Sequence, residues 1–221
     1  VLHYFRWNTT YCFYMGACQN ICSHYRSTHD HNFHKLKKMR KVIAAINMTL
    51  DGFCDHTAGI PDEELHQHYS ELLENAGVIL YGRTTYQLMQ FWQTLLKNPS
   101  GEKSLDEFAI AIDKIPKIVF SHTLKNTEWD TANLSNESIE KEVSELKNKS
   151  GKDILIGSRS LIIQLIELNL IDEFQLCVHP VLIGKGLPLF DKIKDRTIFK
   201  LLKTKTFGSG AIVLYYEPTR Q

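Results

Sequence analysis

Apolar positions from residue 41 onward alternate between short runs typical of buried strands and longer segments with helical spacing. The strand-like runs cover residues 41–48, 78–82, 117–121, 154–156 and 173–184. Helix-like or polar segments separate them. Strands that alternate with helices predict βαβ units, so we expect an α/β fold with a mostly parallel central sheet and helices on both faces.

The predicted helices have recognisable ends. Pro61 is expected as the first residue of one helix, with Asp62, Glu63 and Glu64 in its first turn and Gly77 as its stop. A second helix is expected over RTTYQLMQFW (83–92). A third is amphipathic, over residues 135–151, with an inward stripe formed by Ile139, Val143 and Leu146. The last follows the turn at residues 157–158 and is apolar nearly all round, broken only by Gln164 and Glu167.

The chain ends with two β-rich runs, TIFKLLKTKTF (197–207) and AIVLYYE (211–217). The intervening Gly-Ser-Gly predicts a turn, so the two runs should form a C-terminal antiparallel hairpin. We therefore expect one α/β domain over residues 39–217.

The first 38 residues differ from the rest in composition. They carry five Lys or Arg against the single acid Asp30, a net charge of +4, whereas the remaining residues carry −3. They hold eight aromatic residues, three of the five cysteines and five of the ten histidines, without helical or strand periodicity. We expect residues 1–38 to be a non-native or disordered leader. A zinc site is the alternative, although the C-x5-C and C-x3-C spacings are wider than in common zinc modules.

Charge and hydropathy exclude several classes of partner. The formal net charge of +1 gives no electrostatic reason to expect nucleic acid or an anionic membrane. No apolar segment of spanning length lacks charges. Cys54 and Cys177 lie in or beside apolar runs and are expected to be buried reduced thiols, as in a cytoplasmic protein.

Three of the predicted strands end in short polar turns: YGRTT (81–85), FSHT (120–123) and IGSRS (156–160). Ligands of open parallel sheets bind at these carboxyl ends, beside helix N-termini with unpaired N–H groups. Gly82 and Gly157 would allow close approach of a ligand to the backbone. Hydroxyl groups and positive charge would come from Thr84, Thr85, Ser158, Ser160, Arg83 and Arg159. The set would suit a phosphorylated cofactor, although each serine could be only a helix cap and each glycine only a turn.

Four segments carry a family resemblance: TLDGF, ILYGRTTYQLM, KIVFSHTL and the long run from Ile154 to Phe190. In order and spacing they resemble the dihydrofolate-reductase-like superfamily, most closely the RibD C-terminal reductase domain of riboflavin biosynthesis and its stand-alone relatives. The resemblance implies a dihydrofolate-reductase-like fold that binds NADPH across its strand ends.

The resemblance also implies roles for individual residues. The adenosine-side phosphates would meet Gly82, Arg83, Thr84 and Thr85. Ser121 and His122 would flank the adenine and its 2′-phosphate. Asn47 and Asp51 would lie near the nicotinamide and the substrate. The pyrophosphate would lie against Gly157, Ser158, Arg159, Ser160 and Leu161.

The chain departs from the family pattern at three points. Ser158 replaces the second glycine of a pair, and Ala45 stands where riboflavin reductases usually carry a lysine. True folate reductases have a tryptophan that is missing between Met39 and Gly82. The substrate is therefore left open between pteridines and aminopyrimidines, including 5-amino-6-(5-phosphoribosylamino)uracil.

The expected function is transfer of a hydride from NADPH to a small heterocyclic substrate. Asp51 or a water molecule is the expected proton donor, with Glu63 next, although Asp51 could equally be a turn former. A non-catalytic nucleotide-binding dimer module is the alternative function. A homodimer contact could lie at HPVLIGKGLPLF (179–190), which could also be a covered edge of the core.

Overall fold

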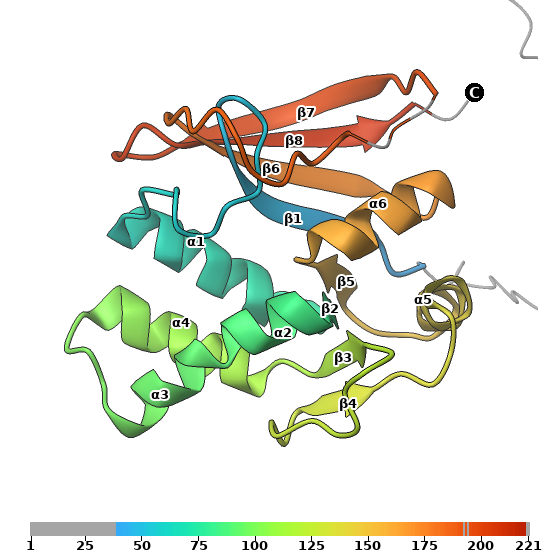
Figure 1. Cartoon of the computed structure of the whole chain (residues 1–221), viewed down its shortest axis with the longest axis horizontal. Helices are drawn as coiled ribbons and strands as arrows, with labels where there is room; N and C mark the ends of the chain where they lie inside the picture. Colours follow the sequence, from blue (N-terminus) through green and yellow to red (C-terminus); the bar gives the residue numbers. More distant parts are fainter. Residues whose placement is uncertain (1–38, 192, 194, 220–221) are drawn as a thin grey trace, which may run out of the picture. The chain divides into compact units, whose positions relative to one another are not determined.

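The computed structural model describes residues 39–191, 193 and 195–219, and these contain an eight-stranded sheet (Figure 1). The strand order is β4-β3-β2-β5-β1-β6-β8-β7. All pairings up to β6 are parallel, whereas β8 is antiparallel to both of its neighbours. The strands are β1 (Val42–Thr49), β2 (Ala76–Gly82), β3 (Lys117–Phe120), β4 (Ala132–Leu134), β5 (Asp153–Ile156), β6 (Glu173–His179), β7 (Phe199–Thr206) and β8 (Ile212–Pro218).

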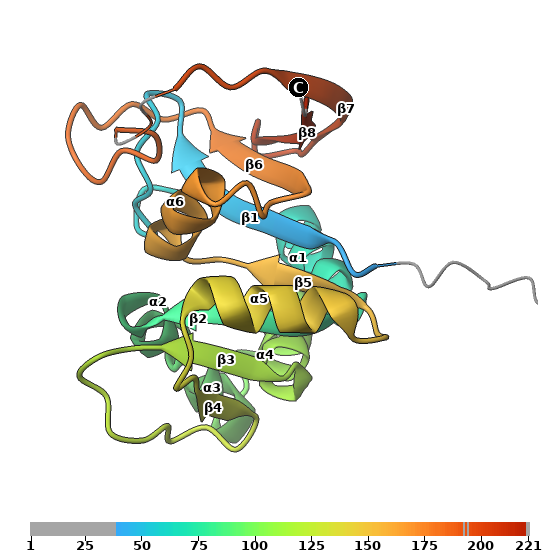
Figure 2. The same cartoon turned by 90° about the vertical axis from the view of Figure 1, so that its right-hand side faces the viewer.

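Helices cover both faces of this sheet (Figures 1 and 2). Their bounds are α1 (Glu63–Glu74), α2 (Arg83–Met89), α3 (Phe91–Lys97), α4 (Lys103–Lys114), α5 (Ile139–Asn148) and α6 (Arg159–Glu167). In the described ranges, none of them is long and apolar enough to cross a membrane. The predicted fold class, a mostly parallel sheet covered on both faces and ending in an antiparallel hairpin, is confirmed.

Alternate residues of β1 pack into two separate parts of the core. Val42, Ala44 and Ile46 pack with the apolar sides of α5 and α6. Ile43 packs on the opposite face, with residues of α1 and α4. A third cluster joins Leu65 of α1 to β6 and the hairpin. The alternation therefore fixes which strand residues can reach each side of the molecule.

Two helix boundaries differ from the prediction. The first helix begins at Glu63, not Pro61, and the Asp62 carboxylate caps it by accepting the Leu65 N–H at 2.8 Å. The helix stops at Glu74, and Gly77 belongs to β2 rather than to a helix end. The side-chain amide of Asn75 donates to the Glu71 carbonyl at 2.8 Å and satisfies the last turn.

The segment between β2 and α5 holds more structure than was predicted from the sequence. The single helix expected over residues 83–92 is two, α2 and α3, which meet at Gln90. α4 was not expected at all, and neither was the short edge strand β4. α4 buries small residues, Ser104, Ala109 and Ala111, against neighbouring elements including α1. The segment 103–114 is nonetheless amphipathic, so its sequence pattern indicated a helix that the prediction missed.

The predictions for residues 1–38 lie outside the described residues, as does the zinc alternative. Lys38–Gln221 form one unit by themselves. Among the described residues, no group of three or more His, Cys, Asp or Glu side chains could hold a metal ion. Cys54 and Cys177 are free thiols, half-buried and buried, and burial raises the pKa of each to about 11.

Candidate functional site

The sheet opens between β1 and β5. Their pairing covers only Val42–Ala44 on β1, whereas the pairing with β6 continues to Thr49. Within the part of the chain that the structure describes, β1 therefore has no strand on its β5 side beyond Ala44. Ala45 is half-buried and Asn47 is exposed, although both lie in a central strand. The gap adjoins the carboxyl ends of β2 and β5, where open α/β sheets bind ligands.

Ser158 joins two of the predicted strand ends. Its hydroxyl accepts the Gly82 N–H at 2.9 Å, and its side chain is almost fully buried. It makes no side-chain cap to α6, so the interpretation of Ser158 as a hydroxyl cap is wrong. Its backbone carbonyl instead accepts the N–H groups of Leu161 and Ile162. The turns after β2 and β5 are thus held together.

The two glycines of these turns differ in what surrounds them. A Cβ on Gly82 would lie 3.2 Å from the Ser160 hydroxyl, so this position is tight. A Cβ on Gly157 would lie 3.5 Å from the Tyr81 ring and 3.9 Å from the Ala45 carbonyl, which are ordinary contacts. Gly157 is outside the left-handed region. A side chain at Gly157 would therefore fill space at the crevice without straining the backbone.

Arg83 connects the first turn of α2 to the turn after β3. Its guanidinium donates to the Thr123 hydroxyl at 2.8 Å. Ser121 organises that turn by accepting the N–H groups of Thr123 and Leu124. His122 and Arg83 are both exposed. Arg83 forms no salt bridge within the described ranges, so its charge can meet an anion.

Arg159 is engaged elsewhere. Its Nε donates to the Pro188 carbonyl at 2.7 Å, and it forms a salt bridge of 2.8 Å with Asp191. Its side chain thus fastens the loop before β7 rather than supplying charge to the turn. The Leu161 side chain is buried in the core. Thr84 and Ser160 are exposed and Thr85 is half-buried, and no side-chain hydrogen bond is formed by these three in the described structure.

Asn47 lies in a hydrogen-bond network that the sequence did not reveal. Its Oδ1 is 2.9 Å from the Tyr69 hydroxyl and 3.1 Å from His179 Nε2. His179 Nδ1 accepts the Ile60 N–H at 3.1 Å, so the ring proton is on Nε2, which donates to Asn47. The carbonyl of the amide must then face the network, and its two N–H groups remain for another acceptor. In the sequence, the one signal of this network was Asn47 itself, a polar residue inside an apolar strand.

Burial keeps the network in one protonation state. It lowers the pKa of His179, which favours the neutral ring that Ile60 requires. It raises the pKa of the Tyr69 hydroxyl well above the usual value, so this group remains a donor. The Asn47 amide is therefore held in the same orientation across the neutral pH range.

Asp51 anchors a loop. Its carboxylate accepts the Thr49 hydroxyl at 2.6 Å and the N–H groups of Gly184 at 2.7 Å and Ile183 at 3.1 Å. These bonds, that of Thr49 foremost, hold the pKa of Asp51 below its usual range. A carboxylate that is stabilised in this way is a poor proton donor at neutral pH, so its surroundings argue against that predicted role.

Glu63 lies at the exposed start of α1. Its neighbours there bind the turn of the hairpin: Asp62 accepts the Ser209 N–H and Glu64 accepts the Gly208 N–H. The start of α1 is about 9 Å along the helix from Tyr69, at the usual rise per residue. The Glu63 side chain itself makes no hydrogen bond or ion pair among the described residues, and the structure does not group it with Asn47.

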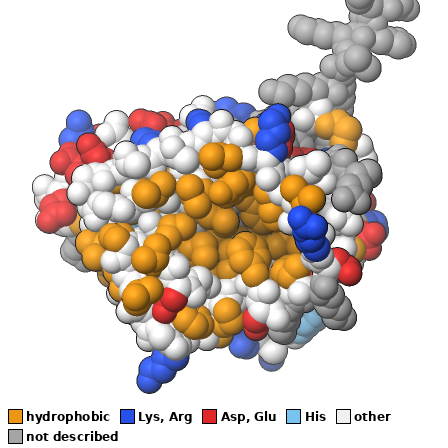
Figure 3. Space-filling model, turned by 90° about the horizontal axis from the view of Figure 1, so that it is seen from above, with side chains coloured by type: hydrophobic (Ala, Val, Ile, Leu, Met, Phe, Trp, Pro, Cys, Tyr) orange, Lys and Arg blue, Asp and Glu red, His pale blue; other side chains and the backbone are white. Residues whose placement is uncertain are grey.

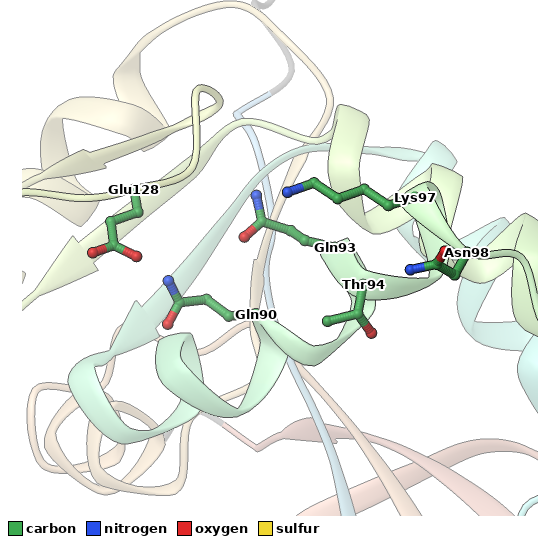
Figure 4. A pocket seen from close by; sticks show the side chains of 6 residues that line it. All are labelled: Gln90, Gln93, Thr94, Lys97, Asn98 and Glu128. Carbon is green, nitrogen blue, oxygen red and sulfur yellow. The ribbon is translucent and has the colours of Figure 1, made fainter.

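A separate hollow of about 410 Å³ lies beside α2 and α3 (Figure 4). Glu128 faces Gln90 and Gln93 across it. All of its lining side chains are polar, and none belongs to the predicted site. Asn47, Arg83 and Ser158, which the sequence predicted at the strand ends, do not line this hollow.

Comparison with known proteins gives a family match. Residues 40–213 match the model of the RibD C-terminal domain. "Uncharacterized protein YyaP" of Bacillus subtilis (strain 168) is 37% identical over 183 residues, which are 81% of this chain and 95% of that protein.

Solved structures share the fold. A putative riboflavin biosynthesis protein from Shewanella sp. PV-4 superposes with a TM-score of 0.62 at 19% identity, covering 81% of this chain and 99% of its own. Dihydrofolate reductase from Enterococcus faecalis, complexed with NADP(H), gives 0.54 at 13% identity, covering 81% and 97%. The family match covers most of the residues that form the sheet and its crevice, and the chain belongs to the RibD C-terminal domain family.

Proposed function

We propose that the chain is an NADPH-dependent reductase that transfers a hydride to a small heterocycle of the pteridine or aminopyrimidine type. The observation that carries the proposal is the crevice beside β1, where Asn47 is exposed and the turns at Gly82 and Gly157 converge. Its family is reductase-like, and one fold relative is complexed with NADP(H).

The residues at the crevice fit a dinucleotide phosphate. The first turn of α6 presents backbone N–H groups that have no helical partner. Gly157 has no side chain there, so a ligand can approach the backbone closely. Arg83 donates to one neutral group among the described residues, the Thr123 hydroxyl, and its guanidinium can bind a 2′-phosphate at the turn of Ser121 and His122.

NADPH, when bound, supplies the hydride. The protein's own part is to orient the reacting rings and exclude water. The N–H groups of Asn47 are directed toward the crevice by Tyr69 and His179, and we assign them to an acceptor on the nicotinamide or the substrate. The proton is assigned to a water molecule, because Asp51 holds its loop as a carboxylate.

The same engagement of Asp51 favours a second candidate, a non-catalytic nucleotide-binding module. One experiment distinguishes the two functions. NADPH binding is measured by its fluorescence, and NADPH oxidation by its absorbance, with a panel of pteridines and aminopyrimidines. Binding with substrate-dependent oxidation supports the reductase. Binding without oxidation of any panel member supports the module, and no binding overturns both.

A further inference from the structure

His179 fastens residues 55–61, a part of the loop that joins β1 to α1 (Figure 1). We call residues 55–61 the β1–α1 segment. The Nδ1 atom of His179 accepts the Ile60 N–H at 3.1 Å. Among the described residues, this is the one hydrogen bond between the segment and another part of the chain. The remaining bonds of the segment form a turn around Asp55 and lie within it.

The chain on either side of this segment is held by other bonds. The Cys54 N–H donates to the Leu187 carbonyl at 2.8 Å. On the other side, the Asp62 carboxylate accepts the Ser209 N–H at 2.6 Å. Loss of the bond at the histidine would therefore free the β1–α1 segment without loosening its flanks.

Burial of apolar surface adds little to the fastening of the segment. None of its side chains is buried, and Ile60 is 50% exposed. Ile60 thus adds to the apolar surface of the molecule, a broad part of which Figure 3 shows. Gly59 lies directly against the histidine, because a Cβ added there would be 3.3 Å from both Cε1 and Nε2 of His179. A segment with few buried contacts opens locally at low cost, and its opening would uncover this ring.

A single proton decides whether the ring can hold the segment. In the neutral ring, Nδ1 is an acceptor and bonds the Ile60 N–H. In the charged ring both nitrogens are donors, so Nδ1 presents an N–H to another N–H and the bond is lost. Nε2 carries its proton in both states, and its donation to Asn47 at 3.1 Å is unaffected.

We propose that His179 is an acid-sensitive latch, which holds the β1–α1 segment against its ring when neutral and releases it when protonated. Release gives water access to the ring and to the Asn47 amide beside it, while the amide keeps its orientation. The consequence for hydride transfer rests on the proposed function, because water is then less well excluded from the site. The latch itself does not depend on that function.

The groups that face the ring set the direction of its titration. Burial lowers the pKa of His179 from its ordinary value of 6.5, and the Asp62 carboxylate at the start of α1 opposes this shift. Cys177 on β6 lies 3.7 Å from Nε2 and stays a thiol, because burial raises its pKa to about 11. Tyr69, which reaches the ring through Asn47, also keeps its proton. The segment should therefore be held at neutral pH and released only below pH 6.5.

Other titratable groups near the segment do not act on the same bond. The hydrogen bonds from Thr57 lower the pKa of Asp55, so this turn keeps its carboxylate until lower pH. His56 is exposed and makes no hydrogen bond in the described structure. The lysines of β7 act on His68 and not on His179.

Amide hydrogen exchange of the full chain tests the latch, with rates corrected for the intrinsic effect of pH. Between about pH 7.5 and 4.5, we expect protection of the Ile60 amide to fall at least about tenfold as His179 is protonated. NMR of the ring gives the midpoint independently. The Leu155 amide on β5 should keep its protection, which excludes global unfolding.

Three results of this titration would overturn the proposal. The first is unchanged protection of Ile60 through the protonation of His179. The second is a loss at Ile60 in step with Leu155, because the whole fold would then be opening. The third is a ring that stays neutral throughout the range in the folded chain.

His179→Gln removes the proton while keeping both bonding groups. Its amide can accept from Ile60 and donate to Asn47 but cannot titrate, so the Ile60 amide should stay protected over the whole range. His68→Phe is the matched control, a second buried histidine whose ring packs against Phe207 instead, and it should release the segment as the parent does. Acid release that persists in His179→Gln, or that disappears in His68→Phe, would assign the effect to another group and refute the latch.

Discussion

The side-chain amide of Asn47 has one orientation, because His179 can only donate to it. That donation follows from the Ile60 N–H, which occupies Nδ1 of the ring. The N–H groups of Asn47 are then left for another acceptor at this exposed position. The Asn47 amide can therefore donate to an acceptor on a ligand. An ionised aspartate at this position could not, because it has no hydrogen to donate.

Asn47→Asp is therefore expected to keep the network and lose the ligand contact. The carboxylate can still accept from Tyr69 and His179. We expect a melting temperature close to the parent and a fall of at least about tenfold, ~1.4 kcal/mol, in NADPH-dependent turnover or affinity. Tyr69→Phe, which leaves the N–H groups in place, should have a smaller effect. Equal losses in the two variants would indicate that the network acts only on stability.

Arg83→Ala tests the choice of cofactor. Arg83 is exposed and has no acidic partner among the described residues, so it can bind a 2′-phosphate, which NADH lacks. The expected loss is about 1.5–3 kcal/mol in NADPH binding, the usual range for a hydrogen bond to a charged group, with NADH nearly unchanged. Titration of each cofactor by fluorescence gives both values. If both cofactors weaken alike, Arg83 contacts a group that they share.

At the scale of elements, the turns after β2 and β5 act as a pair. Ser158 satisfies the N–H of Gly82 from the neighbouring strand, although 76 positions separate them. Loss of that hydroxyl leaves a buried donor unpaired, a change that costs more than the loss of an exposed hydrogen bond.

Ser158→Ala is expected to lower the free energy of unfolding by about 1–3 kcal/mol. Urea denaturation measures the change, and Ser160→Ala provides the control because its hydroxyl is exposed and should alter stability by less than about 0.5 kcal/mol. Similar changes in the two variants would mean that the hydrogen bond between Ser158 and Gly82 does not stabilise the fold.

Gly157→Val tests whether a side chain at this turn blocks the cofactor without straining the backbone. Gly157 has no left-handed backbone, and its added Cβ meets only ordinary contacts, so the variant should fold. Its side chain should occupy the space beside the first turn of α6 and weaken NADPH at least tenfold, about 1.4 kcal/mol. A thermal melt without ligand shows whether the fold is intact. Parental affinity in a folded variant would show that the phosphates do not approach this turn.

At the scale of the whole molecule, low pH should reduce stability through the protonation of buried histidines. Burial lowers the pKa of His68 to about 4 and also lowers those of His66 and His179. The unfolded chain, with ordinary histidines near 6.5, therefore binds more protons between pH 6.5 and 4. Stability is full above pH 6.5 and should fall through this window, by about 3 kcal/mol for His68 alone.

Thermal melts between pH 6.5 and 4 measure how steeply stability falls with pH. His68→Phe should reduce it, since the ring packs against Tyr69, Phe207 and Tyr215 and an uncharged ring can replace it. A slope that is unchanged in His68→Phe would assign the loss to other groups. Carboxylates with lowered pKa, such as Asp51, act only at still lower pH.

Some features followed from the sequence alone because they depend on neighbouring residues. Alternating apolar runs set the strand and helix order, and Gly-Ser-Gly set the hairpin turn. The inward stripe of Ile139, Val143 and Leu146 was confirmed in α5. In each case the information lies within one or two helical turns or one strand.

Tertiary structure alone decided the contacts that define the site. Asn47 meets His179 across 132 positions, Asp51 meets Gly184 across 133, and Arg159 reaches Asp191 across 32. Such partners leave no periodic signal, because the pairing of β1 with β6 and the path of one loop bring them together. The sequence thus determined which strand ends carry polar groups, whereas the folded sheet decided which of those groups are already bonded and which remain available to a ligand.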